Sequence, residues 1–487
     1  MYNGRQLRTK HTKWVTLTTM AIVVFVVDAT IVVNPEIEEA VAYGSEIDQP
    51  VYRNDLQKRV IYEGDQVWRI YKHNDSVNEL VQHYDEYGSY SIWSNEPSTA
   101  DIFIRSYMLD NVESILKDCG INYQVLIDDV QEAIEEENTP LSMEMQEELE
   151  GRKARYVWWW QGVRSRYPRP RPLRYPASVH GVGGPWRFRG HRMEWTSYHR
   201  LDDIHGYLNY LAETYPDVCS IQTIGNSIEG RPLKVLRISN GKTNAPAIWI
   251  DGGIHAREWI SPAAVTYIID FLVENSESLE TDYYILPVVN PDGYEHTFIS
   301  DRLWRKNRRK GVNCAGIDLN RNFGYRWGGK GTSRNMCHDT YPGNKPFSEP
   351  ETDAIRNFFE NSLADFKAYL SFHSYGQYIL YPWGYDQRLP PDYRDLDSVG
   401  RQAAEAMKKA AGDNTVYTVG NSAITLYPAA GGSDDWAKAL LKIKYAFTIE
   451  LRDTGRYGFI LPARYIIPTA KEALAAIQTI TEVVKKS

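Results

Sequence analysis

The stretch that decides the fold of this chain is Pro246-Ala-Ile-Trp-Ile-Asp-Gly-Gly-Ile-His-Ala-Arg-Glu-Trp-Ile-Ser-Pro262. Ala247 to Asp251 is a short run of apolar, β-branched and aromatic residues, as expected of a buried strand, and Gly252-Gly253 signals a turn directly after it. We expect a helix next, with Ser261 as its N-cap and Pro262 as its first residue. Because strand-like and helix-like runs continue to alternate downstream, the sequence predicts an α/β fold with helices on both faces of a sheet.

His255 and Glu258 stand three residues apart in the connection after this strand. Such a spacing arises by chance, and in isolation it is usually part of a surface ion pair. A catalytic zinc, however, takes three protein ligands of the histidine and carboxylate type and keeps one position open. Two further strand-like runs supply matching groups, since 366–373 ends in His373 and 445–450 ends in Glu450. Ligands in open α/β sheets bind beyond the carboxyl ends of strands, so we predict a zinc site there.

Several ordered motifs extend this prediction to about residue 198 and onward to the end of the chain. The motifs are Ile254-His-Ala-Arg-Glu-Trp259, Asn290-Pro-Asp-Gly-Tyr294, Arg302-Leu-Trp-Arg-Lys306, Asp318-Leu-Asn-Arg-Asn322, Phe372-His-Ser-Tyr375, Pro428-Ala-Ala-Gly-Gly-Ser-Asp-Asp-Trp436 and Ile449-Glu-Leu-Arg-Asp453. They resemble, in the same order, the secreted digestive-type zinc carboxypeptidases of the A/B group. The resemblance implies an eight-stranded mixed sheet in an α/β/α arrangement, preceded by a small antiparallel α/β pro-domain of the ferredoxin-like kind. It also implies a zinc-dependent exopeptidase that removes the C-terminal residue of peptides and proteins.

The resemblance assigns catalytic roles to particular residues. It implies one zinc ion per chain, held by His255, Glu258 and His373, with Glu450 as the general base that later returns its proton to the leaving amine. Arg305 matches the cation that faces the developing oxyanion. The alternatives are structural: Glu450 could be a buried strand glutamate paired with Arg452, and Arg305 could be one of the solvated charges around it.

Further matches concern the substrate. An exopeptidase must recognise a free carboxylate, for which a planar, bidentate arginine is suited. Arg321, with Asn320 beside it, occupies the position that the resemblance gives to this role. The remaining matches are a mobile tyrosine that closes over the terminal residue, a carboxylate that orients a zinc histidine, and two contacts to residues further along the peptide; these are Tyr427, Asp318, and Arg257 with Tyr375.

The pocket for the C-terminal side chain is expected to decide specificity. In this family an apolar residue at its base gives the A type and an aspartate gives the B type, and the matching residue here is Asp434. A buried carboxylate is costly unless it is paired, so it favours a lysine or arginine side chain in the pocket. Ser422 and Gly384, at matching wall positions, are small enough to admit one. We therefore expect release of C-terminal Lys or Arg, with an A-type preference for apolar or aromatic residues as the alternative.

Four cysteines are present. Cys314 and Cys337 flank the motif that starts at Asp318, at the spacing of the family's disulfide, so we expect them to be bonded in an oxidising compartment. Cys119 and Cys219 are expected to be two buried free thiols, with a bridge between them as the alternative.

The N-terminal region divides by composition. Residues 1–13 carry four basic and no acidic side chains, and 14–27 are uncharged and mostly apolar. This pattern predicts a secretory signal peptide over about residues 1–29, with a membrane anchor through 14–33 as the alternative. Residues 50–139 match the family's pro-domain in position and pattern, and an unrelated binding domain is the alternative. Asn74-Asp-Ser76 is a candidate glycosylation acceptor if the chain is exported.

Residues 140–197 change from acidic to strongly basic. Between Arg152 and Arg192 there are 11 Lys or Arg residues and no acidic ones, together with Trp158-Trp-Trp160 and repeated Arg-Pro pairs. Such a segment cannot form a packed core, and we interpret it as an activation linker that a trypsin-like protease cuts. A polyanion-binding arm or an error in the gene prediction are the alternatives. The catalytic domain would then span 198–487, with the pro-domain as its intramolecular inhibitor.

Composition excludes several other classes of protein. The chain has 487 residues, 43% of them hydrophobic, and a formal net charge of -8, which is ordinary for soluble globular domains and gives no reason to expect nucleic acid as a partner. No Gly-x-Ser-x-Gly elbow of a serine hydrolase occurs in the sequence. A homologue that binds peptides without cleaving them should lack the base or a ligand, whereas all of these residues are present. We expect a secreted monomer.

Overall fold

The computed structural model describes residues 59–72, 91–139, 193–412 and 415–486, together with residues 77, 81 and 191 and two short strands near the N-terminus. The chain divides into a unit of residues 1–55 and a unit of residues 56–487. In the first, β1 (Val26–Val27) pairs antiparallel with β2 (Thr30–Ile31). The other residues of the predicted signal peptide or anchor, the glycosylation acceptor, and the activation linker up to residue 190 lie outside the described residues.

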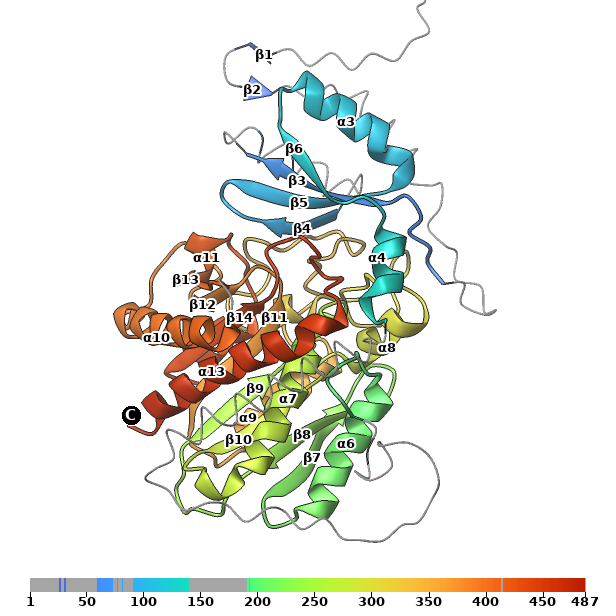
Figure 1. The fold of residues 1–487 in the computed structure, drawn as a ribbon. Coiled ribbons are helices and arrows are strands. Elements are labelled where there is room, and N and C mark those ends of the chain that lie inside the picture. The colour runs from blue at the N-terminus through green and yellow to red at the C-terminus, as the bar shows by residue number, and fades with distance from the viewer. Residues whose placement is uncertain are drawn as a thin grey trace, which may run out of the picture. The chain divides into compact units, whose positions relative to one another are not determined.

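An eight-stranded sheet forms the centre of the larger unit (Figure 1). Its strand order is β13-β12-β14-β11-β9-β10-β8-β7, with parallel pairing from β14 through β10 and antiparallel pairing of β12 with β14 and of β8 with both of its neighbours. This is the mixed sheet that the resemblance implies. The strands are β7 (Cys219–Asn226), β8 (Pro232–Ile238), β9 (Ala247–Asp251), β10 (Asp282–Leu286), β11 (Phe366–Ser374), β12 (Tyr378–Tyr381), β13 (Thr418–Asn421) and β14 (Tyr445–Leu451).

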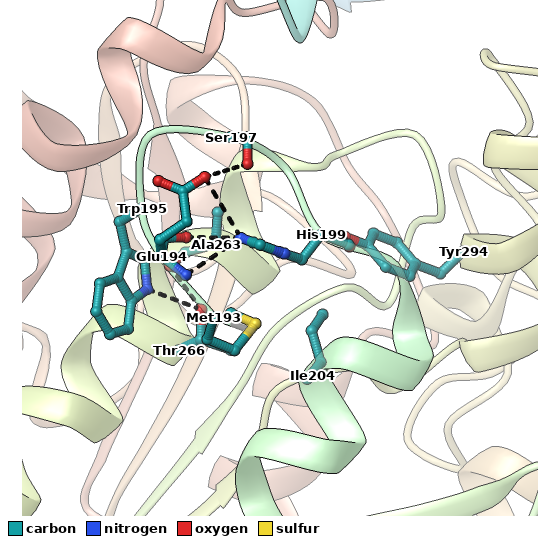
Figure 2. A pocket seen from close by; sticks show the side chains of 9 residues that line it. All are labelled: Met193, Glu194, Trp195, Ser197, His199, Ile204, Ala263, Thr266 and Tyr294. Atoms are coloured by element: carbon teal, nitrogen blue, oxygen red, sulfur yellow. Dashed lines mark hydrogen bonds and ion pairs between the residues drawn. The ribbon is translucent and has the colours of Figure 1, made fainter. Parts of the chain in front are cut away.

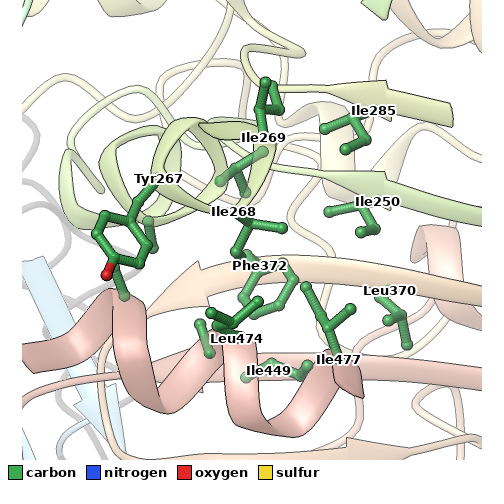
Figure 3. Close-up of a cluster of buried hydrophobic side chains, with 14 of the residues drawn as sticks. Ile250, Tyr267, Ile268, Ile269, Ile285, Leu370, Phe372, Ile449, Leu474 and Ile477 are labelled. Atoms are coloured by element: carbon green, nitrogen blue, oxygen red, sulfur yellow. The ribbon is translucent and has the colours of Figure 1, made fainter. Parts of the chain in front are cut away.

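Helices cover both faces of this sheet and divide the core into two hydrophobic clusters. On one face α6, α7, α10 and α13 bury strand side chains such as Ile250, Phe372 and Ile449 (Figure 3). On the other face α9 and α12 pack against Trp249 and Tyr369. The helices are α6 (Leu201–Thr214), α7 (Ile260–Glu274), α8 (Pro291–Ile299), α9 (Pro350–Asn361), α10 (Tyr393–Ala411), α11 (Ser422–Thr425), α12 (Ser433–Ala439) and α13 (Ile466–Val484). Within the described residues, none is both long and apolar enough to cross a membrane.

The connection from β9 to α7 carries His255 and Glu258. All five residues of β9 are buried, as expected for a central parallel strand with both faces covered. The predicted helix start is wrong by about two residues, because α7 begins at Ile260 and Ser261 is not its N-cap. The hydroxyl of Ser261 instead accepts from Gly253 N (3.0 Å) and donates to Phe372 O (2.6 Å). Ser261 therefore ties the turn after β9 to strand β11.

A separate four-stranded antiparallel sheet, in the order β4-β5-β3-β6, forms the N-terminal part of the larger unit. Its described elements are β3 (Gln66–Tyr71), β4 (Ser91–Asn95), β5 (Thr99–Ile104), α3 (Leu109–Asp118), β6 (Tyr123–Ile127) and α4 (Val130–Glu137). Asp129 is the N-cap of α4 and accepts from Gln131 N and Glu132 N. This small antiparallel module agrees with the expected pro-domain fold.

The expected pro-domain is held against the expected catalytic domain by a buried ion pair and an apolar cluster. Arg302 Nε donates to Glu137 Oε2 (2.6 Å), a second guanidinium nitrogen donates to the other oxygen of Glu137, and both side chains are 1% exposed. The Arg302 guanidinium also lies 3.8 Å from the centre of the Trp259 ring. Nearby, Trp93 and Phe103 of the pro-domain pack with Phe459 and other residues of the catalytic part. Loss of one partner of such a buried pair is strongly destabilising, so this contact fixes the end of α4.

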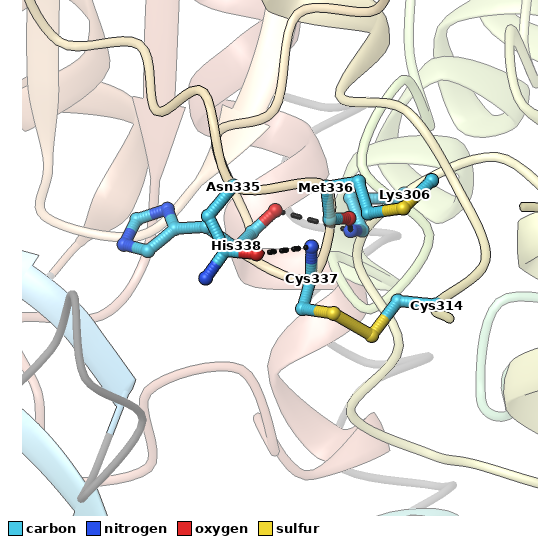
Figure 4. The surroundings of a disulfide bond; sticks show 6 residues. All are labelled: Lys306, Cys314, Asn335, Met336, Cys337 and His338. Carbon is cyan, nitrogen blue, oxygen red and sulfur yellow. Dashed lines mark hydrogen bonds between the residues drawn. A yellow bond between two sulfur atoms is a disulfide. The ribbon is translucent and has the colours of Figure 1, made fainter. Parts of the chain in front are cut away.

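The cysteine predictions are confirmed in part. Cys314 and Cys337 form a disulfide bond (Figure 4). Cys119 and Cys219 are both free, and Cys219 is buried as expected. The expected burial of Cys119 is wrong: the residue is exposed because it follows the end of α3, beyond that helix's buried side chains Val112 and Leu116.

Candidate functional site

His255, Glu258 and His373 converge at the carboxyl ends of β9 and β11. One potential ligand atom from each lies within 4.8 Å of the others, and all three side chains are buried. Glu258 Oε1 lies 2.7 Å from His255 Nδ1, and Oε2 lies 3.2 Å from His373 Nδ1. The structure therefore brings together the three predicted zinc ligands, although His373 stands 118 residues from His255.

The hydrogen bonds around the two imidazoles leave their Nδ1 atoms facing one another. Ser371 Oγ donates to Asp251 Oδ1 (2.6 Å), so it can accept from His373 Nε2 (3.1 Å), which makes Nδ1 the nitrogen with the free lone pair. His255 Nε2 lies 3.3 Å from Asp318 Oδ1, outside hydrogen-bond geometry, and among the described residues it has no other partner.

This donor set suits a divalent cation. The two Nδ1 atoms are only 3.2 Å apart, and both lie within hydrogen-bond distance of the Glu258 carboxylate. A bound cation would satisfy all three groups at once. Imidazole nitrogens with one carboxylate are ligands that zinc takes in catalytic sites, so the residues fit the metal that the sequence predicts.

The electrostatics agree with a cation site. Although burial raises the pKa of Glu258, the neighbouring His255 and His373 lower it further, so the net shift is well below its usual range. Burial lowers the pKa of His373, but Glu258 more than compensates and raises it to about 9. The carboxylate is therefore ionised and attracts positive charge.

Asp318 lies behind His255 and pairs with Arg305. Arg305 Nη2 and Nε both donate to Asp318 Oδ2, at 2.9 and 3.2 Å, and Nη1 lies 4.0 Å from Glu258 Oε1. Burial raises the pKa of Asp318, but Arg305, Arg321 and His255 together hold it well below its usual range. The guanidinium of Arg305 is thus fixed beside the predicted zinc ligand Glu258. The resemblance places it there to face an oxyanion.

Glu450 stands opposite His373 in the register of β14 and β11. Burial raises the pKa of Glu450 to about 7, with His373 and Arg305 lowering it and Glu258 raising it. The structural alternative, a pair with Arg452, is absent: Arg452 Nε instead donates to Glu472 Oε1 and Oε2, at 3.0 and 3.1 Å. Within the described residues Glu450 has no ion-pair partner. It is therefore a carboxyl group available for proton transfer.

Arg321 is almost fully buried, and its guanidinium is oriented by backbone carbonyls. Nε donates to Gly331 O and Nη1 donates to Asn320 O, each at 3.0 Å. Asn320 Oδ1 in turn accepts from Ser433 N at the start of α12 (3.0 Å). Tyr427 is 38% exposed and forms no hydrogen bond with the described residues. The structure thus leaves this tyrosine on the surface, in the loop that follows α11.

The first turn of α12 carries two aspartates with different surroundings. Asp435 Oδ1 and Oδ2 accept from the backbone nitrogens of Gly384 and Tyr385, each at 2.8 Å. Asp434 is 7% exposed and, among the described residues, has no ion-pair partner. Burial raises the pKa of Asp434, with smaller lowering by backbone hydrogen bonds and by His373 and Arg321. Ser422 and Gly384 lie near one another, since a Cβ added to Gly384 would meet Ser422 Cβ at 3.7 Å.

The two predicted contacts for residues further along the peptide lie where the pro-domain meets the catalytic part. Tyr375 OH donates to Asp101 Oδ2 of the pro-domain (2.9 Å), and Asp101 is itself paired with Arg69 through two 2.7 Å hydrogen bonds. Arg257 is buried, with its guanidinium 4.2 Å from the centre of the Phe459 ring. The pro-domain therefore accepts a hydrogen bond from the hydroxyl of Tyr375, a residue that was predicted to contact substrate.

Several residues around the site escaped the sequence analysis. Asp339 pairs with Arg257, Glu137 pairs with Arg302, and Asp101 accepts from Tyr375. Their partners lie 82, 165 and 274 residues away, so no local pattern points to them. Asp339 alone had a weak signal, because it follows the expected disulfide residue Cys337 by two positions.

A small pocket near residue 195 includes none of the three predicted zinc ligands in its lining (Figure 2). Its lining includes Glu194, Trp195, Ser197 and His199. Ser197 Oγ donates to Glu194, and Trp195 Nε1 donates to Thr266 Oγ1 (3.3 Å). These polar groups satisfy one another, so the pocket has the character of local packing.

Comparisons with known proteins identify the family of the chain. The family described as zinc carboxypeptidase matches residues 204–476, and the one described as carboxypeptidase activation peptide matches residues 68–137. The chain is 46% identical over 301 residues to carboxypeptidase B of Astacus astacus, covering 60% of this chain and 99% of that relative. It is 37% identical over 410 residues to carboxypeptidase A4 of Mus musculus, covering 81% and 87%. The crystal structure of thrombin activatable fibrinolysis inhibitor superposes with a TM-score of 0.71 at 33% identity and covers 88% of this chain and 100% of that one.

Proposed function

The chain belongs to the zinc carboxypeptidase family and carries that family's activation peptide, and from this premise we propose that it releases C-terminal Lys or Arg residues from peptides and proteins after its pro-domain is removed. The metal would be held by His255, Glu258 and His373. The observation that carries the proposal is the convergence of these three buried groups within 4.8 Å. They lie at the carboxyl ends of the central parallel strands, where Glu450 stands opposite His373.

Zinc, when bound, supplies Lewis-acid polarisation of a carbonyl group and acidifies a water molecule. Glu450 would take a proton from that water and hand it to the leaving amine, because it is a carboxyl group with no ion-pair partner among the described residues and with a pKa raised by burial to about 7. Arg305, held in place by Asp318, would donate hydrogen bonds to the oxyanion as it forms. Asp318 would also orient the imidazole of His255.

Binding of the substrate's end would rest on Arg321. The guanidinium uses Nε and Nη1 for backbone carbonyls, which fixes its plane while no carboxylate among the described residues pairs with it. A free C-terminal carboxylate is the natural partner of such a donor. Asn320 would assist, and Tyr427 would close over the terminal residue from its exposed position.

The proposed preference for basic residues rests on Asp434. A nearly fully buried carboxylate is costly without a cation, and no described residue supplies one within ion-pair distance. The side chain of a C-terminal Lys or Arg would supply it. Relatives with both A and B names match the chain, so the preference stands on this pocket and not on the comparisons.

The pro-domain would inhibit by occupying groups that the substrate needs. Asp101 accepts from Tyr375, and Trp93 packs against Phe459 beside Arg257. We propose that a trypsin-like protease cuts within residues 140–197 and frees the site, and that the protein acts as a secreted monomer.

The test combines activation with a choice of substrates. The purified full-length chain is treated with trypsin, its new N-terminus is sequenced, and peptides that end in Arg or in Phe are compared by kcat/KM. We expect zinc-dependent release of the terminal residue with a higher kcat/KM for Arg. A higher kcat/KM for Phe would reject the basic preference, and no release from either peptide by zinc-loaded protein would reject the exopeptidase.

A further inference from the structure

Asp339 pairs with Arg257, the residue that directly precedes Glu258 in the chain. Arg257 Nη1 donates to Asp339 Oδ2 at 3.1 Å and, at a longer 3.4 Å, to Leu303 O. Arg257 Nε is buried and has no hydrogen-bond partner among the described residues. The Arg257 side chain is 5% exposed, whereas that of Asp339 is 37% exposed. The carboxylate therefore holds one end of a buried guanidinium whose other donors remain available.

The segment that carries Asp339 is itself fixed in place. We call residues 335–341 the Asp339 loop. Lys306 Nζ donates to Met336 O (2.8 Å) and to His338 O (3.0 Å), on either side of Cys337, which is bonded to Cys314 (Figure 4). Tyr341 O, at the end of the loop, accepts from Asp318 N (2.9 Å). A buried ammonium, a disulfide and a backbone hydrogen bond thus pin a loop that has no regular secondary structure.

The charges around Asp339 keep it in the form that binds a guanidinium. Burial raises its pKa, but Arg257, Arg305 and Lys306 together lower it below its usual range. An ion pair at an open surface contributes little, because solvent competes for both groups. Here the arginine is removed from solvent, so the pair determines the orientation of its guanidinium.

We propose that Asp339 is a positioning residue that acts through Arg257 and determines how well the enzyme binds peptides longer than a dipeptide. The inference rests on the proposed function, since Arg257 is the predicted contact to residues further along the peptide. With Asp339 in place, Nη1 is paired and the guanidinium is held over the Phe459 ring, while Nε and Nη2 form no hydrogen bond with the described residues. Without it, only the longer hydrogen bond to Leu303 O and the ring contact remain.

The test uses binding as well as turnover. The full chain is activated by limited trypsin digestion, and benzoyl-Gly-Arg is compared with benzoyl-Ala-Ala-Gly-Arg. For binding, both peptides are titrated calorimetrically into zinc-loaded protein that carries Glu450→Gln. We expect Asp339→Asn to weaken binding of the longer peptide about tenfold, the size expected for loss of one charge-assisted hydrogen bond, and to change binding of the shorter one less than about twofold. In turnover the same variant should raise KM for the longer peptide and leave kcat near the wild-type value.

A double-mutant cycle distinguishes this role from simple destabilisation. In the Arg257→Ala background, Asp339→Asn should cause no further loss, because the partner through which it acts is gone. Asp339→Glu should restore part of the binding. Asp282→Asn is the matched control, since Asp282 pairs with Arg237 at 2.7 Å but lies at the opposite, amino end of the parallel strands; it should leave both peptides unaffected.

Two results would overturn the inference. Equal weakening of both peptides by Asp339→Asn would mean that the residue only supports the loop, and additive losses with Arg257→Ala would mean that it acts independently. Failure of the proposed function has a different signature, because the wild-type chain would then release no residue while the calorimetric coupling between positions 257 and 339 persisted.

Discussion

The predicted zinc ligands and the first turn of α12 bury their carboxylates in opposite ways. Around the zinc ligands, Glu258 lies against two imidazoles and Asp318 against Arg305, and the pKa of each carboxyl is lowered despite burial. In α12, burial raises the pKa of Asp434, and among the described residues no cation pairs with it. The first region has cationic groups of its own, whereas the proposed basic preference requires that the substrate supply the cation for the second. This contrast makes an unpaired buried carboxylate a testable basis for a substrate preference.

Removal of the metal or of one of its ligands should have the largest effect. His373→Ala deletes one of the three groups that converge within 4.8 Å, and it should leave the activated chain with neither stoichiometric zinc nor measurable release of C-terminal residues. Chelation of wild-type protein should abolish activity in the same way, and added zinc should restore it. Metal analysis and assay of the same samples check both statements. Full activity in metal-free protein would contradict the contrast drawn above. The three convergent side chains would then form a buried hydrogen-bond network without a catalytic metal.

The next largest effect is expected from Glu450→Gln. This change keeps the size of the side chain but removes proton transfer, which typically contributes about 10²- to 10⁴-fold in rate. We expect kcat to fall by that factor while zinc content stays at one per chain. Undiminished turnover would show that a different group moves the proton.

Asp434→Ala tests the other half of the comparison. Loss of a desolvated charge partner costs about 3–4 kcal/mol, so kcat/KM for peptides ending in Arg should fall about 10²- to 10³-fold. Peptides ending in Phe should keep or improve their rate, since their side chain loses no partner, and they serve as the internal control. A parallel loss for both peptides would mean that Asp434 maintains the fold of α12 and does not select the substrate.

Asp318→Asn is expected to have the smallest effect of these substitutions. It tests the carboxylate that is paired with Arg305. The variant keeps the shape beside His255 but weakens the pairing with Arg305, and outer carboxylates of this kind are typically worth about 10- to 100-fold in metal affinity or activity. Competition with a chromogenic chelator would measure the zinc affinity. Unchanged affinity together with unchanged kcat would show that His255 and Arg305 are oriented without this carboxylate.

Sequence reasoning reached the parts of the molecule that local patterns encode. Strand β9 begins and ends at the predicted residues, and His255, His373 and Glu450 stand at or just beyond the ends of the three predicted strands because parallel strands carry their ligands at one edge. The motifs added the proposed roles of Arg305 and Arg321, which no periodicity suggests and which stay predictions.

The rest depended on contacts between distant parts of the chain. Ser261 has the composition of a helix cap, yet tertiary hydrogen bonds to Gly253 and Phe372 claim its hydroxyl, so the helix starts earlier than predicted. The pairs of Glu137 with Arg302 and of Asp339 with Arg257 join segments that sequence separation keeps apart. Cys119 was expected to be buried, but exposure of a thiol after a helix depends on which face of that helix packs.

Anomalous diffraction at the zinc absorption edge from crystals of the purified chain tests the central claim most directly. We predict a single strong peak per chain, bounded by His255 Nδ1, His373 Nδ1 and the carboxylate of Glu258, beside the side chain of Glu450. A peak at another group of residues, or none in catalytically active protein, would contradict the account.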